Sequence, residues 1–232
     1  TTILQAAREL GIHIPTLCYH DDLSVSGSCR ICVVEVEGFS TLQIACAFPI
    51  ERPINVTTSS PRIRRSRRHT LDLLLGHHWG DCYTCKRNGS CELQELAADY
   101  GIDTFNYPRP DFGPFELQAD GPIVRDMNKC IGCFRCVRTC GELQDIGALV
   151  KVDRGELVHI ESYAEKPLID TLCVACGQCI NRCPTGALTE KDYTDDVWAA
   201  IDDPTKHVVI HTAPAPRAAM GEAFDLGPDV SV

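Results

Sequence analysis

Fifteen cysteines among 232 residues constrain this chain more than any other feature of its sequence. The N-terminal stretch TTILQAAREL has no basic start followed by an apolar run, so no signal peptide is visible and we expect a cytoplasmic protein. In a reducing cytosol cysteines more often bind metals than form disulfides, and an odd number cannot all pair. Because only 6% of the residues are aromatic, we expect metal centres, rather than large apolar cores, to hold small domains together.

A repeated cysteine motif, C-x2-C-x2-C-x3-C, gives the strongest signal. CIGCFRCVRTC at 130–140 matches CVACGQCINRC at 173–183. In bacterial-type ferredoxins with two clusters, three closely spaced cysteines bind one 4Fe-4S cube and the fourth binds the other cube. The repeat therefore predicts two 4Fe-4S sites, one held by Cys130, Cys133, Cys136 and Cys183, the other by Cys173, Cys176, Cys179 and Cys140.

Two further expectations concern the backbone of this repeat. We expect the fourth cysteine of each copy at the start of a helix. Gly132 and Gly177 have no side chain, so they should let backbone amides approach the inorganic sulfides. Zinc is the rival metal, because paired C-x2-C units also bind it tetrahedrally. Zinc would leave the third cysteine of each triplet without a role, which favours iron–sulfur clusters.

Four cysteines near the N-terminus have a different spacing, C-x10-C-x2-C-x13-C. Plant-type ferredoxins use C-x4-C-x2-C and a distant fourth cysteine, so only the middle pair keeps that pattern. Strand-like segments around this pair suit a small sheet that holds a cluster in its loop. We predict a 2Fe-2S centre, with structural zinc as the alternative, held by Cys18, Cys29, Cys32 and Cys46.

The remaining cysteines, Cys82, Cys85 and Cys91, leave a 4Fe-4S cube one ligand short. His78 lies four residues before Cys82 and is the predicted fourth ligand, with His77 as the neighbouring alternative. This assignment uses every cysteine in the chain and gives four sites of four ligands each. Six other histidines are interpreted as surface or packing residues: His13, His20, His69, His159, His207 and His211.

Local patterns predict the secondary structure. Cap residues and apolar spacing indicate helices, and alternating or β-branched runs indicate strands. Pro108, Pro110, Pro114 and Pro122 mark a linker. The predicted helices cover residues 1–10, 61–75 (ended by Gly76), 92–100 and 217–224; the predicted strands cover 31–37, 42–46, 54–57 and, as a buried strand, 208–210.

Charge and motif content exclude several functions. The net charge of −10 argues against a general nucleic-acid binder, which needs a basic surface. No apolar run approaches the length of a membrane span. Neither a nucleophile elbow nor a phosphate-binding loop is present. Five arginines crowd the start of the helix predicted from Pro61, and they indicate either a solvated face or a docking patch for an acidic partner: Arg62, Arg64, Arg65, Arg67 and Arg68.

Taken in order, the four cysteine motifs resemble the accessory-cluster region of iron-only ([FeFe]) hydrogenases. The cluster-rich subunit of respiratory NADH dehydrogenase and the large subunit of NAD-linked formate dehydrogenases are similar in their first half. The stretch HVVIHTAPAPRAAMGEAFDLGPDV at 207–230 resembles the opening of the hydrogenase catalytic domain. There Pro216 replaces the valine usual in that family.

The resemblance implies an α+β protein with four parts. They are a β-grasp 2Fe-2S ferredoxin domain without its N-terminal hairpin, a small helical domain that binds a 4Fe-4S cluster through one histidine and three cysteines, a bacterial-type two-cluster ferredoxin domain, and the start of a hydrogenase catalytic domain. On this basis both ends look truncated. The expected boundaries are 1–59, 60–107, 120–198 and 205–232.

The implied function is an electron relay within an oxidoreductase. One 2Fe-2S and three 4Fe-4S clusters would carry electrons between redox partners and an H2-forming centre. The partners would be ferredoxin or a flavin-bearing NADH-oxidising subunit, in a hetero-oligomer. No catalytic residue is expected in this segment, since ligands for the catalytic H-cluster would lie beyond Val232. The alternatives are the same relay in a formate dehydrogenase, or a standalone diaphorase or NADH dehydrogenase cluster subunit.

Overall fold

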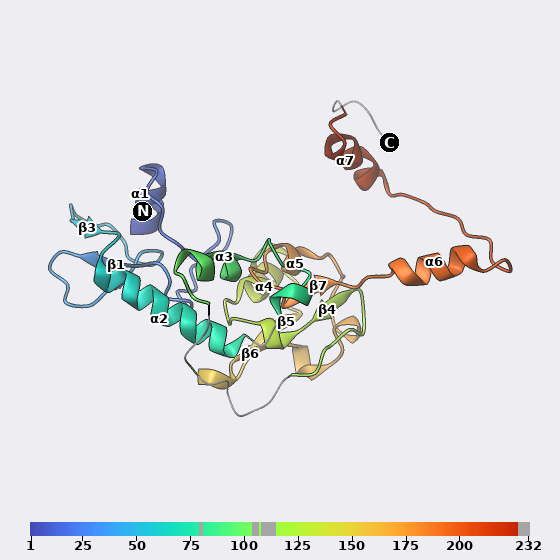
Figure 1. Ribbon diagram of the computed structural model, residues 1–232, viewed down its shortest axis with the longest axis horizontal. Helices are drawn as coiled ribbons and strands as arrows, with labels where there is room; N and C mark the ends of the chain where they lie inside the picture. The colour runs from blue at the N-terminus through green and yellow to red at the C-terminus, as the bar shows by residue number, and fades with distance from the viewer. Residues whose placement is uncertain (79–80, 104–106, 108–114, 227–232) are drawn as a thin grey trace. The chain divides into compact units, whose positions relative to one another are not determined.

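The computed structural model describes residues 1–78, 81–103, 107 and 115–226 (Figure 1). The chain divides into two compact units, Thr1–Lys191 and Asp192–Val232, and each is described by itself. The linker prolines Pro108, Pro110 and Pro114 lie outside the described residues. None of the described helices combines the length and apolar composition needed to cross a bilayer.

The N-terminal part of the first unit is a short helix beside a small antiparallel sheet. Helix α1 (Ile3–Glu9) begins with a capping box, in which Thr2 and Gln5 satisfy each other's backbone amides. The sheet has the order β2-β1-β3. The predicted helix and the three predicted strands are confirmed, but the strands are shorter: β1 (Val33–Val36), β2 (Gln43–Ile44) and β3 (Val56–Thr57).

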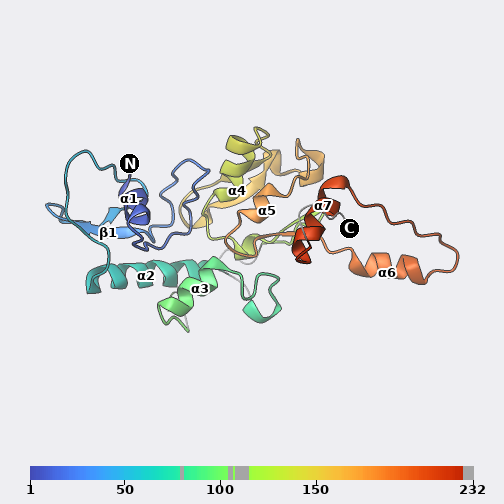
Figure 2. The same ribbon diagram turned by 90° about the horizontal axis from the view of Figure 1, so that it is seen from above.

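Helix α2 (Pro61–His77) is the longest helix of the chain's described residues. The Ser60 side chain accepts a hydrogen bond from the Ile63 amide, and Pro61 occupies the first turn, as the sequence predicts. The predicted stop at Gly76 is wrong. Gly76 is buried inside the helix, and the last hydrogen bonds run from the amide of His78 to the Leu74 and Leu75 carbonyls. In both ribbon views α2 extends from the small sheet toward α3 (Figure 2).

Helix α3 (Glu92–Asp99) begins directly after Cys91, and its prediction is confirmed. Beyond it, each copy of the cysteine repeat is flanked in the sequence by two strands, and the four strands form two antiparallel pairs. The pair β4–β7 joins the start of this segment to its end, and β5–β6 is a hairpin inserted between the two copies. The elements are β4 (Ile123–Arg125), α4 (Arg135–Arg138), β5 (Leu149–Val152), β6 (His159–Ser162), α5 (Gln178–Asn181) and β7 (Leu188–Glu190).

The fourth cysteine of each repeat does not start a helix, contrary to expectation. Cys140 lies in a π-helical turn (Thr139–Leu143) that follows α4, and Cys183 follows the end of α5. The reason is a left-handed residue, Phe134 or Gly177, directly after the second cysteine. This residue lets the helix begin just before the third cysteine of the motif. The third cysteine therefore lies on the helix, and the fourth comes after it.

Cysteines take part in all three apolar cores of the described chain. One core lies under α1 and the small sheet and contains Cys32 and Cys46. A second joins Leu71 of α2 and Leu93 of α3 to Cys18, Cys29 and Cys133. The third fills the repeat segment and contains Cys136, Cys179 and Cys183. Because thiols stand where aliphatic residues would otherwise pack, the cores and the predicted metal sites share the same space.

The second unit has helices α6 (Thr194–Asp202) and α7 (Pro214–Ala223) joined by an extended segment. The sequence did not predict α6. Helix α7 corresponds to the helix predicted at 217–224 but starts earlier, with a proline in its first turn. The predicted buried strand at 208–210 is wrong. This segment forms no strand, and Val209 and Ile210 are 76% and 78% exposed.

Candidate metal centres

The four N-terminal cysteines are buried and lie in two pairs. Cys18 is hydrogen-bonded to Cys29, and Cys32 to Cys46. The hydrogen bond from Cys29 lowers the pKa of Cys18 to about 5, and the same bond raises the pKa of Cys29. In a 2Fe-2S rhomb each iron has two sites left after its two sulfides, so a two-by-two arrangement of thiols fits such a cluster.

The small sheet brings the second pair together. Cys32 precedes β1 and Cys46 follows β2, and these strands are adjacent in the sheet. The Ala45 amide donates to the Cys32 carbonyl at 3.1 Å, which ties the two ends of the strands. The first pair lies in the loop between α1 and β1. Arg138 of α4 reaches this loop and donates to the Cys18 carbonyl at 2.6 Å.

His78 and the three cysteines Cys82, Cys85 and Cys91 line a single cavity. His77 is not part of this lining. Its Nδ1 contacts the Leu73 carbonyl of the preceding helical turn, and it faces a different hollow of the surface. Between the two neighbouring histidines, the structure therefore groups His78 with the three thiols.

The imidazole of His78 is held in one tautomer. Its Nδ1 lies 3.0 Å from the Lys129 carbonyl, and a carbonyl can only accept a hydrogen bond, so Nδ1 carries the proton. A histidine protonated at Nδ1 has its lone pair on Nε2, the atom through which such a ring can bind a metal. A backbone carbonyl in this role is the usual partner of a histidine ligand in proteins.

Gly186 closes the same cavity from the repeat segment. A Cβ atom at this position would lie 2.8 Å from Sγ of Cys85, closer than real Cβ contacts. Only a glycine therefore leaves the Cys85 sulfur in its present place. Cysteine spacing does not indicate a role for Gly186, although this residue follows closely on the cysteine and proline of the run Cys183-Pro184-Thr185-Gly186.

The cysteine repeat forms two groups that exchange their fourth members. Cys140 lines one cavity with Cys173, Cys176 and Cys179, the triplet of the other copy. Cys183 lies close enough to Cys130, Cys133 and Cys136 to raise the pKa of each by electrostatic repulsion. Burial is the larger cause, and it raises the pKa of Cys130 to about 11 and that of Cys179 to about 12. Thiolates are costly in these places unless a cation compensates them.

The two copies of the loop share one backbone conformation. The residue before the second cysteine has a positive φ in both copies, Gly132 at 61° and Ala175 at 54°. The amide of each donates to the sulfur of the first cysteine at 3.4 Å. Gly132 was expected to let backbone amides approach inorganic sulfides, whereas in the structure its amide donates to the sulfur of Cys130. The loop needs a left-handed turn, which glycine adopts without strain and alanine also adopts here, and the turn aims an amide at a cysteine sulfur.

Three hydrogen bonds, made by His78, Glu92 and Arg87, join the segments around the His78 cavity to the segments that contain Cys130 and Cys183. The Lys129 carbonyl, one residue before Cys130, accepts from both His78 and Thr185, the latter at 2.8 Å. The Glu92 amide, one residue after Cys91, donates to the Pro184 carbonyl at 3.0 Å. Arg87 donates to the carbonyl of Cys183 itself. We call this set of contacts the seam; motif spacing contains no signal for it.

In the part of the chain that the structure describes, no three His, Cys, Asp or Glu side chains converge as one ion requires. A tetrahedral zinc ion would need its ligands about 2.3 Å from one point. In a cluster the cysteines bind different irons, so their sulfurs do not have to converge in this way.

Three family models match the first unit in succession. The 2Fe-2S iron-sulfur cluster binding domain matches residues 1–61. The NADH-ubiquinone oxidoreductase-G iron-sulfur binding region matches 67–105. The ferredoxin-like domain of NADH-quinone oxidoreductase subunit 3 matches 121–189. The chain thus contains ferredoxin-like domains of both the 2Fe-2S and the 4Fe-4S kind in an α+β fold.

A solved structure agrees over most of the chain. The NAD+-reducing [NiFe]-hydrogenase in its H2-reduced state contains a chain that is 35% identical, with a TM-score of 0.75, over 82% of this chain and 80% of that one. The chain belongs to the family of NADH-ubiquinone oxidoreductase G-type iron–sulfur proteins. Members of this G-type family among the curated relatives include the NADH-ubiquinone oxidoreductase 75 kDa subunit of Reclinomonas americana, 39% identical over 83% of this chain and 27% of its own length.

A hydrogenase subunit matches more of the chain. The NADP-reducing hydrogenase subunit HndD of Solidesulfovibrio fructosivorans is 44% identical over 100% of this chain. The chain spans 40% of that relative's length, so the activity of a whole protein does not follow from the match. These relatives are hydrogenases and NADH dehydrogenases, which makes the G-type family one of electron-transferring oxidoreductase subunits.

Proposed function

We propose that this chain is the electron-relay part of an iron-only hydrogenase that exchanges electrons with NAD(P)H-linked or ferredoxin partners in a hetero-oligomer. The observation that carries the proposal is the match to the NADP-reducing hydrogenase subunit over the entire chain. The NADH oxidoreductase relative matches 83%, a share close to that of the unit Thr1–Lys191 alone. The specific iron-only assignment also draws on the resemblance of 207–230 to the entry of a hydrogenase catalytic domain.

Four ligand sets would hold one 2Fe-2S and three 4Fe-4S clusters, and such clusters, when bound, take up and release single electrons. The chain's residues set the spacing of the ligands and bury half of them, while Cys82 and Cys176 are exposed. The proposed ligands are Cys18, Cys29, Cys32 and Cys46; His78, Cys82, Cys85 and Cys91; Cys130, Cys133, Cys136 and Cys183; and Cys173, Cys176, Cys179 and Cys140.

The donor chemistry of the residues supports this assignment. Each set consists of thiols, or of thiols and one imidazole, and in the cysteine repeat burial raises the pKa of Cys130 and Cys179, so that these thiols resist ionisation without a nearby cation. The seam then provides a short hydrogen-bonded connection from the ligand set of His78 to the ligand set of Cys130. From the His78 ring it runs across one hydrogen bond to the Lys129 carbonyl and through one peptide bond to Cys130.

Metal analysis tests the ligand sets. Anaerobically prepared protein should contain about 14 irons per chain and a similar amount of acid-labile sulfide. About 10 irons would mean that one cube is absent. Stoichiometric zinc would contradict the assignment of the site that holds it.

Measurement of H2 evolution tests whether residues 1–232 transfer electrons without forming H2 themselves. All 15 cysteines are taken up by the proposed relay, so residues 1–232 should accept electrons from dithionite but evolve no H2, even after treatment with the H-cluster maturation proteins. H2 evolution by these residues alone would refute the proposal.

A second candidate is the diaphorase-type iron–sulfur subunit of a NAD-linked nickel–iron hydrogenase. It is favoured by the structural match at a TM-score of 0.75 to a chain of such an enzyme. Purification of the native complex separates the two candidates. Nickel in stoichiometric amount would favour this second candidate, and H2 turnover without nickel would favour the iron-only assignment. Molybdenum or tungsten would point to the formate dehydrogenase alternative.

A further inference from the structure

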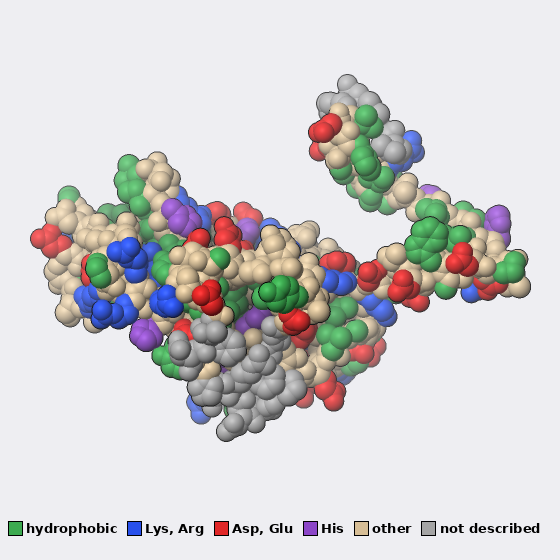
Figure 3. Space-filling model, in the orientation of Figure 1, with side chains coloured by type: hydrophobic (Ala, Val, Ile, Leu, Met, Phe, Trp, Pro, Cys, Tyr) green, Lys and Arg blue, Asp and Glu red, His purple; other side chains and the backbone are tan. Residues whose placement is uncertain are grey.

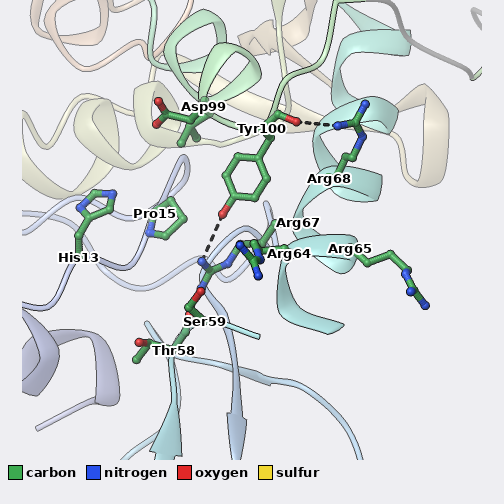
Figure 4. A pocket seen from close by; sticks show the side chains of 11 residues that line it. His13, Pro15, Thr58, Ser59, Arg64, Arg65, Arg67, Arg68, Asp99 and Tyr100 are labelled. Atoms are coloured by element: carbon green, nitrogen blue, oxygen red, sulfur yellow. Dashed lines mark hydrogen bonds between the residues drawn. The ribbon is translucent and has the colours of Figure 1, made fainter. Parts of the chain in front are cut away.

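A groove of about 680 Å³ opens on the first unit where α2 and α3 meet the loop after α1 (Figure 4). None of the proposed cluster ligands lines it. Helix α2 contributes four arginines to its wall, His13 lies on the opposite side, and Asp99 of α3 adds a single acidic group. The lining arginines are Arg64, Arg65, Arg67 and Arg68.

These arginines differ in their burial and in their hydrogen-bond partners. Arg67 is buried and donates to the Val33 carbonyl at 2.8 Å and to the Tyr100 hydroxyl at 3.2 Å, so it is a structural residue and not part of a solvated face. Arg68 donates to the Tyr100 carbonyl at 2.7 Å. Arg64 and Arg65 are exposed, and the side chain of neither has a hydrogen-bond or ion-pair partner among the described residues. Two guanidinium groups are therefore available to an outside partner.

The charge of this surface is opposite to that of the whole chain. The net charge is −10, yet Lys and Arg side chains gather around the start of α2 (Figure 3). A partner rich in Asp and Glu would be repelled by the chain as a whole and attracted at this place. Such a pattern orients an encounter as well as strengthening it.

The spread of the cationic groups favours a protein surface over a small anion. In Figure 4, Arg65 extends away from Arg64 and Arg67, so the guanidinium groups do not converge on one point. A bound phosphate needs converging donors, whereas several carboxylates on a protein surface match charges that are spread along a helix.

The groove also lies next to two of the proposed ligand sets. Arg67 holds the carbonyl of Val33, the residue directly after Cys32. Leu96, which lines the groove, packs in one apolar core with Cys18, Cys29 and Cys91. A protein seated in the groove would thus be close to the sites at which electrons could enter or leave.

We propose that the groove at Arg64 and Arg65 is the docking surface for an acidic electron-transfer protein. The inference rests on the proposed relay function and adds the place and chemistry of a partner. In each productive encounter one electron leaves the reduced partner, which becomes oxidised, and one centre of this chain is reduced by it. No proton or bond is exchanged in this step.

The test compares two charge-reversed proteins with the unmodified chain. The variant R64E/R65E reverses the groove, and the matched control R52E/R154E makes the same change in net charge at exposed arginines outside the groove. The variant R64Q/R65Q removes the groove charges without adding new ones. The probe is an acidic plant-type 2Fe-2S ferredoxin, with its dissociation constant measured at low and high salt and its electron transfer followed by stopped flow. ATP serves as the small-anion probe.

We expect R64E/R65E to weaken ferredoxin binding on the order of tenfold or more at low salt, and R64Q/R65Q to weaken it less. Binding to the control and to the unmodified chain should be alike and should fall with salt. Equal weakening in the control, or unchanged binding in R64E/R65E, would overturn the proposal. ATP binding that requires Arg64 and Arg65, with ferredoxin binding unaffected, would also overturn it in favour of a small-anion site.

Reduction by dithionite through methyl viologen distinguishes a failure of the relay function from a failure of the docking surface. This small cationic mediator needs no docking surface, so all variants should be reduced like the unmodified chain, with equal iron content. Failure of the unmodified chain to be reduced by viologen would contradict the relay function itself. Normal viologen reduction with unchanged ferredoxin binding in R64E/R65E would contradict only the docking surface.

Discussion

At the scale of single residues, His78 is the most informative position in the chain. Its Nδ1–H is fixed by the Lys129 carbonyl, and its ring shares a cavity with three cysteines. A neutral imidazole in place of a thiolate removes one negative charge from a cluster, and histidine ligation raises the potential of Rieske centres.

We therefore predict that His78→Cys lowers the midpoint potential of one 4Fe-4S centre by on the order of 100 mV, provided that the cube assembles. Potentiometric titration with electron paramagnetic resonance measures the shift. His77→Ala is the matched control and should change nothing, because His77 does not line the cavity. An unchanged potential in His78→Cys would remove His78 from the proposed ligands.

Gly186 gives a second prediction at this scale. Gly186→Ala places a Cβ atom where the Cys85 sulfur lies, so the sulfur must move and the cluster of this site should be lost or weakened. Iron analysis should show about four fewer irons per chain, with the other signals intact. Gly141→Ala is the control, since a Cβ atom there meets nothing within 4 Å although Cys140 is adjacent. Equal iron content in both variants would show that the close approach at Gly186 is not needed.

At the scale of elements, the start of α2 connects local sequence to the docking groove. The Ser60 hydroxyl caps the helix by accepting from the Ile63 amide at 3.2 Å, and the groove arginines follow directly. Ser60→Ala should cost about 1 kcal/mol of local stability and fray this turn. Hydrogen exchange should become faster at the Ile63 amide. Ser59→Ala is the control, because Ser59 is not the cap; equal acceleration in both variants would contradict the capping role.

The same element shows why an arginine run cannot be interpreted from charge alone. Residues 62–68 were expected to act as one surface, either solvated or docking. The helical period separates them instead. Arg67 turns inward with Ile63 and Leu71 on the buried side of α2, while Arg64 and Arg65 remain outside. The buried guanidinium is compensated by the carbonyls of Val33 and Thr58 and by Tyr100.

At the scale of the whole molecule, cysteines replace much of the apolar packing. Every apolar core of the described chain contains proposed ligands, and burial raises the pKa of several of their thiols. Removal of the clusters by chelation should therefore abolish cooperative unfolding of residues 129–190. Hydrogen exchange should show loss of protection in β5, β6 and β7, and in β4 as well, because β4 pairs with β7. Native-like protection in the cluster-free chain would mean that side-chain packing alone suffices.

The sequence by itself determined the features that depend on short-range geometry. Cap residues fixed the starts of α1 and α2. The motif repeat also predicted one long-range feature, the exchange of Cys140 and Cys183 between the two triplets, because repeats of this kind bind two clusters in that way. The structure places Cys140 in one cavity with the triplet of the other copy. The ligand assignment itself stays a prediction. The 208–210 strand failed, because an apolar run forms a strand only when another strand pairs with it.

Only the tertiary structure decided what depends on distant segments meeting. The His78 ring meets the Lys129 carbonyl across 51 residues, and Gly186 meets Cys85 from another part of the chain. Arg67 is buried because β1 and α3 supply acceptors that its own helix lacks. Outside the cysteine repeat, spacing along the chain indicates which ligands fit one loop but contains no information about which loops touch. That choice follows from packing the helices and small sheets around shared cores, and it creates both the seam and the docking groove.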